Sequence, residues 1–117
     1  MQFEERVVGD IAILTVTGDI TLKKGGETRL HEKVDALVQR GHRKVLIDLA
    51  RVSFVDSAGL GELVQAHAIT KNHGGSLGVF NVARRLMDLL SLTRLTTLFP
   101  AYATESEALA SLGARQA

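Results

Sequence analysis

Residues 44–64 encode a strand that leads directly into a helix, and they read KVLIDLARVSFVDSAGLGELV. Residues 45–47, Val-Leu-Ile, form a short apolar run, which is typical of a strand buried on both faces. Asp56 and Ser57 follow, and their side chains can accept hydrogen bonds from the unpaired amides of a first helical turn. We therefore expect a helix to open at Ser57, with an inward stripe made by Leu60, Leu63, Val64 and Ile69.

The chain on either side of this segment alternates between strand and helix patterns. Two β-rich runs, 3–8 and 11–17, are joined by Gly9-Asp10, a pair typical of a tight hairpin. Residues 98–102 suit an edge strand, because Pro100 cannot donate a hydrogen bond within a central one. The other expected elements are a helix over 30–38, strands over 45–49 and 76–80, a short helix around 86–90, and a last helix opened by a capping box at 104–107.

The resulting order, ββαβαβαβα, predicts a single α/β domain. It implies a mixed, mostly parallel sheet of about five strands with four helices. The length of 117 residues, 45% hydrophobic and 23% charged, suits one globular domain over 1–117. Residues 113–117 are expected to be a frayed tail.

Composition argues against several functional classes. With 14 basic and 13 acidic residues the net charge is +1, so we expect no direct nucleic-acid partner. The absence of cysteine excludes disulfides and thiolate chemistry, and the four histidines lack the spacing of a metal pair, so we expect no metal and no cofactor. No run approaches the ~18 apolar residues of a membrane span, and no signal peptide is apparent, so we expect no membrane insertion and a cytoplasmic location.

Ser57 is the residue to which chemistry is most readily assigned, and two interpretations are open. It is either a helix N-cap, worth about 0.5–2 kcal/mol against alanine, or a hydroxyl placed where helix amides favour an anion such as a phosphate. A catalytic nucleophile is not expected. The elbow of serine hydrolases has glycine two positions before the serine, and this chain has Val55 there.

Gly59 and Gly61 lie just inside the same expected helix. Glycine weakens a helix by roughly 1 kcal/mol, so each of these residues needs a reason to be there. They allow either close packing of the helix on the sheet, which we favour, or exposure of the backbone to a partner. A phosphate-binding loop would need glycines before the helix, which are absent.

Three further polar sites have open interpretations. Lys23-Lys24 is either a solvated loop tip or a partner contact. Arg84-Arg85, at the start of a helix, favours a solvated turn over a phosphate site. Asp48 follows an apolar run, so its carboxylate either points inward or lies at the end of the strand.

These residues together resemble the anti-sigma factor antagonist family, whose module is called the STAS domain. The matching runs are 46–49 (LIDL), 52–54 (VSF) and above all 56–61 (DSAGLG). Gly18-Asp19 matches the family's Gly-acidic pair after the second strand, and 74–77 (GGSL) matches its glycine pair before the fourth. The resemblance extends over nearly the whole chain and implies a single STAS-type domain.

The resemblance implies a regulatory protein without catalysis of its own. In the family, the serine after the motif's Asp is phosphorylated by an anti-sigma factor kinase of the histidine-kinase-like ATPase fold, and a serine phosphatase reverses this. The dephosphorylated form binds the anti-sigma factor, which frees the sigma factor and so regulates transcription by partner switching. Carried over, Ser57 is the phosphoacceptor, and the implied partner-binding residues are Asp19, Thr21, Lys23, Asp56, Ser57, Ala58, Gly59, Leu60 and Gly61.

The chain departs from the family pattern at two places. Ala58 replaces a second hydroxyl that many members carry, and Thr21 stands where an acidic residue is common, so the loop with Lys23 is more basic than usual. These departures leave open which partner the chain binds. A separate alternative function is a STAS adaptor subunit of a lipid-transport or scaffold complex that is never phosphorylated, in which Ser57 is only a cap.

Overall fold

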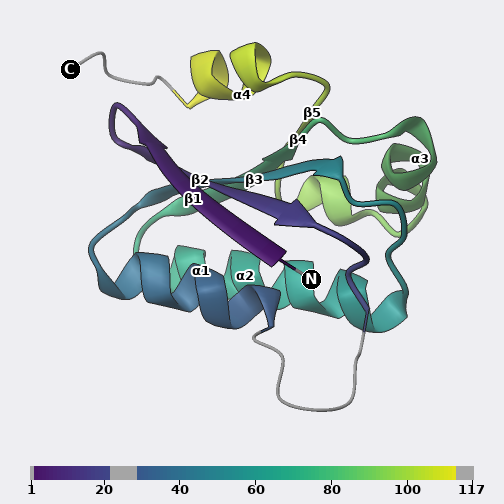
Figure 1. The fold of residues 1–117 in the computed structure, drawn as a ribbon, viewed down its shortest axis with the longest axis horizontal. Coiled ribbons are helices and arrows are strands. Elements are labelled where there is room, and N and C mark those ends of the chain that lie inside the picture. The colour runs from purple at the N-terminus through teal and green to yellow at the C-terminus, as the bar shows by residue number, and fades with distance from the viewer. Residues whose placement is uncertain (1, 22–28, 113–117) are drawn as a thin grey trace.

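The computed structural model of the chain describes residues 2–21 and 29–112 (Figure 1). The order of elements agrees with the α/β prediction, with one 3-10 turn added. The strands are β1 (Gln2–Val8), β2 (Ile11–Thr17), β3 (Lys44–Arg51), β4 (Ser76–Phe80) and β5 (Ala101–Tyr102). The helices are α1 (Leu30–Gln39), α2 (Ser57–Asn72), α3 (Arg84–Leu92), the 3-10 turn η1 (Leu95–Thr97) and α4 (Glu105–Ser111). None of these described helices has the length and apolarity needed to cross a membrane.

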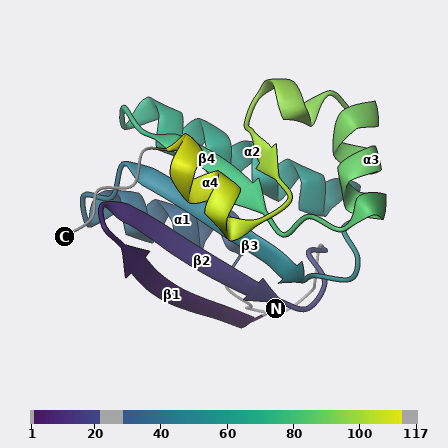
Figure 2. The same cartoon turned by 90° about the horizontal axis from the view of Figure 1, so that it is seen from above.

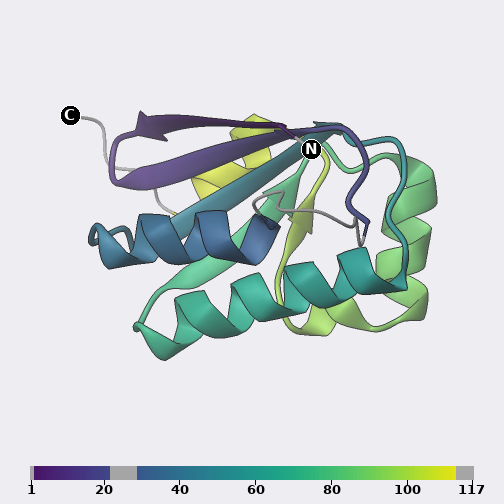
Figure 3. The same cartoon turned by 60° about the horizontal axis from the view of Figure 1, so that its bottom comes forward.

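The five strands form one sheet in the order β1-β2-β3-β4-β5. β1 and β2 are antiparallel, with Val8 opposite Ile11 across the predicted turn, where Gly9 takes a φ of 59°. The other neighbouring pairs are parallel. Because parallel crossovers are right-handed and each new strand adds on the same side, the connecting helices gather on one face of the sheet. Figure 3 shows α1 and α2 side by side beneath that face.

The sheet has a separate core on each face. The larger apolar cluster joins the inward side chains of β2 and β3 to α1, α2 and α3. The smaller cluster lies on the other face and contains Ile13, Leu46 and Phe80 beneath Ala108 of α4, which crosses above the sheet in Figure 2. Because β2 and β3 are parallel, their carboxyl ends lie at the same end of the domain, where the chain enters α2.

The inward stripe of α2 differs from the predicted one. The buried residues are Gly59, Leu63, Ala66 and Thr70. Leu63 was predicted correctly, and Leu60 and Ile69 pack only partly against the core. The prediction for Val64 was wrong, because small residues let this helix lie close to the sheet and set its inward direction, and Val64 is outside both clusters.

The predicted edge strand over 98–102 is also only partly correct. β5 is confined to Ala101–Tyr102, and the chain before it forms η1. Arg94 adopts a left-handed backbone with φ 60° that ends α3 and starts this turn. Pro100 lacks an N–H, so it contributes only its carbonyl, which accepts from the Val79 amide at 3.0 Å. The predicted frayed tail, 113–117, lies outside the described residues.

Candidate phosphorylation and partner-binding site

The first turn of α2 is capped by Asp56 and not by Ser57. Asp56 has an extended backbone, and its Oδ1 accepts from the Gly59 amide at 2.7 Å. The interpretation of Ser57 as the N-cap is therefore wrong, because the carboxylate one residue earlier already takes the amide that a capping hydroxyl would accept from. Ser57 is the first helical residue and is exposed, and its hydroxyl has no hydrogen-bond partner among the described residues.

This turn is held in place by backbone pairing between residues 18–20 and 51–56. The Gly18 amide donates to the Arg51 carbonyl at 3.1 Å, and the Ile20 amide donates to the Phe54 carbonyl at 2.9 Å. The Asp56 amide in turn donates to the Ile20 carbonyl at 3.3 Å. These bonds extend the β2–β3 pairing beyond the strands and fix the direction in which α2 starts.

Asp19 lies beside the same segment, as its place in the motif suggested. Its Oδ1 accepts from the Ser53 hydroxyl at 2.7 Å. The hydroxyl of Ser53 is thereby engaged, whereas that of Ser57 is not.

The two glycines of the motif have different surroundings. A Cβ on Gly59 would lie 1.9 Å from the Ile20 carbonyl oxygen, so the packing interpretation is confirmed for this residue. At Gly61 nothing lies within 4 Å of such a Cβ and the residue is exposed, so the packing interpretation is wrong there and its backbone faces outward. The fold itself supplies no reason for glycine at position 61, where it costs the helix about 1 kcal/mol.

The remaining predicted partner-binding residues are less exposed than Ser57 and Gly61, or lie outside the residues that the structure describes. Ala58 and Thr21 are half-buried, and Leu60 packs partly against the larger core. Lys23 and Lys24 lie outside the described residues. The surface that α2 offers around its start therefore centres on Ser57 and Gly61.

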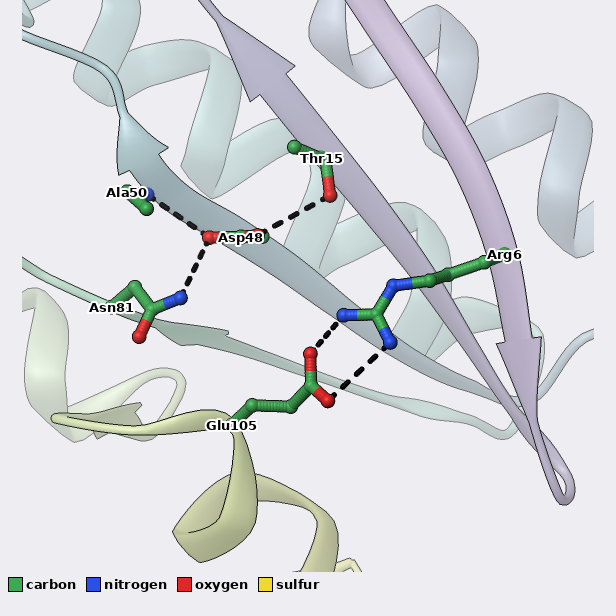
Figure 4. Close-up of polar contacts among 6 residues, drawn as sticks. All are labelled: Arg6, Thr15, Asp48, Ala50, Asn81 and Glu105. Carbon is green, nitrogen blue, oxygen red and sulfur yellow. Dashed lines mark hydrogen bonds and ion pairs between the residues drawn. The ribbon is translucent and has the colours of Figure 1, made fainter.

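Asp48 is an inward carboxylate of β3 on the face that carries α4. Its carboxylate accepts from the Thr15 hydroxyl at 3.3 Å, the Ala50 amide at 3.0 Å and the Asn81 side-chain amide at 3.1 Å (Figure 4). We call these contacts the Asp48 clamp. Asn81 has a left-handed backbone with φ 56°. The clamp thus fixes the points at which the chain leaves β3 toward α2 and leaves β4 toward α3.

Two of the side-chain contacts among the described residues, a carboxylate–histidine contact and an ion pair, connect elements that sequence spacing did not link. Glu62 of α2 contacts His31 of α1, whose Nδ1 lies 2.8 Å from Oε1 and whose backbone amide donates to the same oxygen at 3.3 Å. Arg6 of β1 pairs with Glu105 of α4 (Figure 4), and this hydrogen bond raises the pKa of Arg6 above its ordinary value. Neither pair has a sequence signal, because its members meet only once the helices have packed.

A cavity of about 340 Å³ lies between the loop that precedes α2 and the first turns of α3. Its lining includes Val52, Phe54, Leu86, Leu89 and Arg85. The one sequence signal that could have pointed to this cavity was Phe54. It is an aromatic residue between a strand and a helix, where polar residues are usual.

Comparison with known proteins identifies the class. The STAS domain profile matches residues 2–108, and the chain belongs to this family. An anti-sigma factor antagonist TM1081 homolog of Thermotoga neapolitana is 28% identical over 115 residues, which span 97% of this chain and 99% of that protein.

Solved structures share the fold. The crystal structure of an anti-sigma factor antagonist of Thermotoga maritima superposes with a TM-score of 0.81 at 23% identity, covering 95% of this chain and 94% of that one. The phosphorylated form of the Bacillus cell fate determinant SpoIIAA superposes with a TM-score of 0.68 at 17% identity, covering 95% and 99%. The resemblance to the anti-sigma factor antagonist family and the STAS-type fold are thereby confirmed.

Proposed function

We propose that this chain is an anti-sigma factor antagonist that is switched by phosphorylation of Ser57, and hence a regulatory binding protein without catalysis of its own. The names of its relatives support the antagonist role. The observation that carries the switch is the exposed hydroxyl of Ser57, which has no hydrogen-bond partner among the described residues and stands at the start of α2. A SpoIIAA structure in a phosphorylated form supports the idea that the fold tolerates such a group.

The proposed partner of the unmodified form is an anti-sigma factor of the histidine-kinase-like ATPase fold. The same protein acts as the kinase, and a serine phosphatase restores phospho-Ser57 to serine. Gly61 supports a contact at this place, because its outward backbone would let a partner approach closely and the fold alone does not require glycine there.

The local electrostatics suit a switch that spares the fold. A phosphate adds about −1.5 to −2 charges, and the start of α2 offsets part of this by ~0.3–1 kcal/mol. The Asp56 carboxylate next to it opposes the new charge, but the cap and the packing of Gly59 do not use the Ser57 hydroxyl.

A closely docked partner would be affected far more than the fold. It would meet a bulky dianion where it had met a small hydroxyl, at a cost of several kcal/mol. A loss of about 4 kcal/mol corresponds to roughly a thousandfold in affinity.

The surroundings favour Ser57 over its neighbours as the phosphoacceptor. The Ser53 hydroxyl donates to Asp19, and Ala58 has no hydroxyl. A kinase that binds this surface therefore finds one unengaged acceptor in the motif.

In the test, the purified chain is incubated with MgATP and each histidine-kinase-like ATPase of its organism, and the product is mapped by mass spectrometry. We expect a single phosphate on Ser57, lost in Ser57→Ala and retained in the matched variant Ser53→Ala. Ser57→Ala should bind that kinase whether or not ATP is present, and Ser57→Asp should bind it weakly. If no ATPase modifies Ser57, the proposal fails and the adaptor function is favoured.

A further inference from the structure

The cavity between the α2-preceding loop and α3 is bounded by apolar side chains from two separate segments. Val52 and Phe54 come from the loop, and Leu86 and Leu89 come from α3. Val52 and Leu86 are buried and form its inner lining, whereas the Phe54 side chain is 57% exposed. We call this surface, together with Arg85, the Phe54 groove.

Phe54 is in an unfavourable position for an isolated domain. A large aromatic side chain that stays more than half exposed beside an apolar cavity leaves hydrophobic surface in water. Aromatic residues of this kind are enriched at protein interfaces, where they bury large areas at low cost in conformational entropy.

Arg85 supplies a charge at the same place. It lines the cavity and is exposed, and no carboxylate among the described residues forms an ion pair with it. The first turn of α3 contains no acidic residue. A ligand that brings a carboxylate beside an apolar group would complement this surface.

The two sides of the groove are held in fixed positions. The Asp48 clamp binds the Ala50 amide, just before the loop, and the Asn81 side chain, just before α3. The groove is also continuous along the chain with the phosphoacceptor turn, since Phe54 is followed at once by residues 55–57. A partner seated on Ser57 would meet a preformed groove, which lowers the entropic cost of binding.

We infer that the Phe54 groove is a second docking point for the anti-sigma factor. It would receive an acidic segment of that protein that presents one large apolar side chain. The apolar side chain would bury Phe54 against Leu86 and Leu89, and the carboxylates would pair with Arg85. This inference rests on the proposed function, because it takes the partner of Ser57 as its occupant.

The experiment measures, by isothermal titration calorimetry, the affinity of the kinase identified through Ser57 for variants of the unmodified chain. We expect Phe54→Ala and Arg85→Glu each to weaken binding about tenfold or more, as loss of a central interface residue does. Val7→Ala is the matched apolar control, since Val7 is 58% exposed on β1 at the opposite edge of the sheet. Arg84→Glu is the charge control, because Arg84 does not line the cavity. Both controls should change the affinity less than about threefold, and thermal melts should show all four variants folded.

Three results would overturn the inference. If Phe54→Ala and Arg85→Glu bind like their controls while Ser57→Asp still weakens binding, the groove fails and the proposed function stands. If no anti-sigma factor binds the unmodified chain, the proposed function fails and the groove proposal fails with it. If the chain alone self-associates and Phe54→Ala abolishes this, the occupant is a second copy of the chain.

Discussion

Asp56 and Ser57 are adjacent polar residues with separate roles at the start of α2. The Asp56 carboxylate satisfies the Gly59 amide, whereas the Ser57 hydroxyl satisfies no described group. We predict that Asp56→Ala lowers the free energy of unfolding by about 0.5–2 kcal/mol, and that Ser57→Ala changes it by less than about 0.5 kcal/mol. Urea denaturation of both variants measures this. An equal loss for Ser57→Ala would mean that its hydroxyl is bonded in the fold and poorly available to a kinase.

His67 on α2 should make the stability depend on pH. Its Nδ1 is buried without a hydrogen-bond partner among the described residues, and the ring lies 6.0 Å from that of Phe99. Burial lowers the pKa of His67 below its ordinary 6.5, and the positive charge of Lys71 lowers it further. The unfolded chain therefore binds this proton more tightly than the folded one, which favours unfolding in acid.

The stability associated with His67 should be complete above its unfolded pKa of about 6.5 and should fall as the pH drops through the lower folded pKa. We predict that His67→Leu flattens the profile of unfolding free energy below about pH 6.5, where this proton is taken up. Lys71→Gln should flatten it partly. Parallel profiles for wild type and His67→Leu would show that His67 does not carry the effect.

At single positions, the sequence singled out residues of the motif but did not determine what each one does in the fold. The motif located Ser57, but either Asp56 or Ser57 could have capped the helix, since both types are strong N-caps. Gly59 and Gly61 also look alike in sequence. Only the tertiary position of Ile20 separates them, because its carbonyl occupies the space beside Gly59 alone.

Within α2, we predict that alanine at the two glycine positions has opposite effects on stability. Gly59→Ala places a methyl group 1.9 Å from the Ile20 carbonyl oxygen, so the helix must move away from the backbone it packs on. We expect a loss of about 1–3 kcal/mol or more. Gly61→Ala meets no atom and should raise the stability by up to about 1 kcal/mol.

Thermal melts of the two alanine variants check this pair. If Gly59→Ala were as stable as Gly61→Ala, the close contact between α2 and the β2 extension would be wrong. The pair is informative because both residues lie in the same helix, two positions apart.

The elements themselves were largely predictable, because their signals are local. The hairpin at Gly9-Asp10, the start of α2 and the Thr104 cap of α4, which accepts from the Glu107 amide at 3.2 Å, all depend on neighbouring residues. The inward face of α2 and the short β5 were not predictable in full. The inward face depends on how closely α2 approaches the sheet. The length of β5 depends on where the Val79 amide of β4 can donate to the Pro100 carbonyl.

Across the molecule, the proposed docking surface and the contacts that hold it join segments that the sequence keeps far apart. The Asp48 clamp joins residues from three strands or strand ends, and the Phe54 groove joins a loop to a helix about thirty residues later. No spacing rule detects such contacts, because they follow from the strand order. The class of protein was nevertheless predictable, since the DSAGLG turn lies within one continuous stretch.

The proposed switch should act on binding and not on folding. The structure holds α2 through Asp56, Gly59 and the pairing of 18–20 with 51–56, none of which uses the Ser57 hydroxyl. A dianion at position 57 should therefore leave the domain intact while obstructing a closely packed partner.

The most direct test prepares the chain with phosphoserine incorporated at position 57 and measures its affinity for the kinase by calorimetry, beside its melting temperature. We predict an affinity loss of about a hundredfold or more, with a melting temperature within about 4 °C of the unmodified chain. Equal affinities for the two forms, or a phosphorylated chain that is unfolded, would contradict the account.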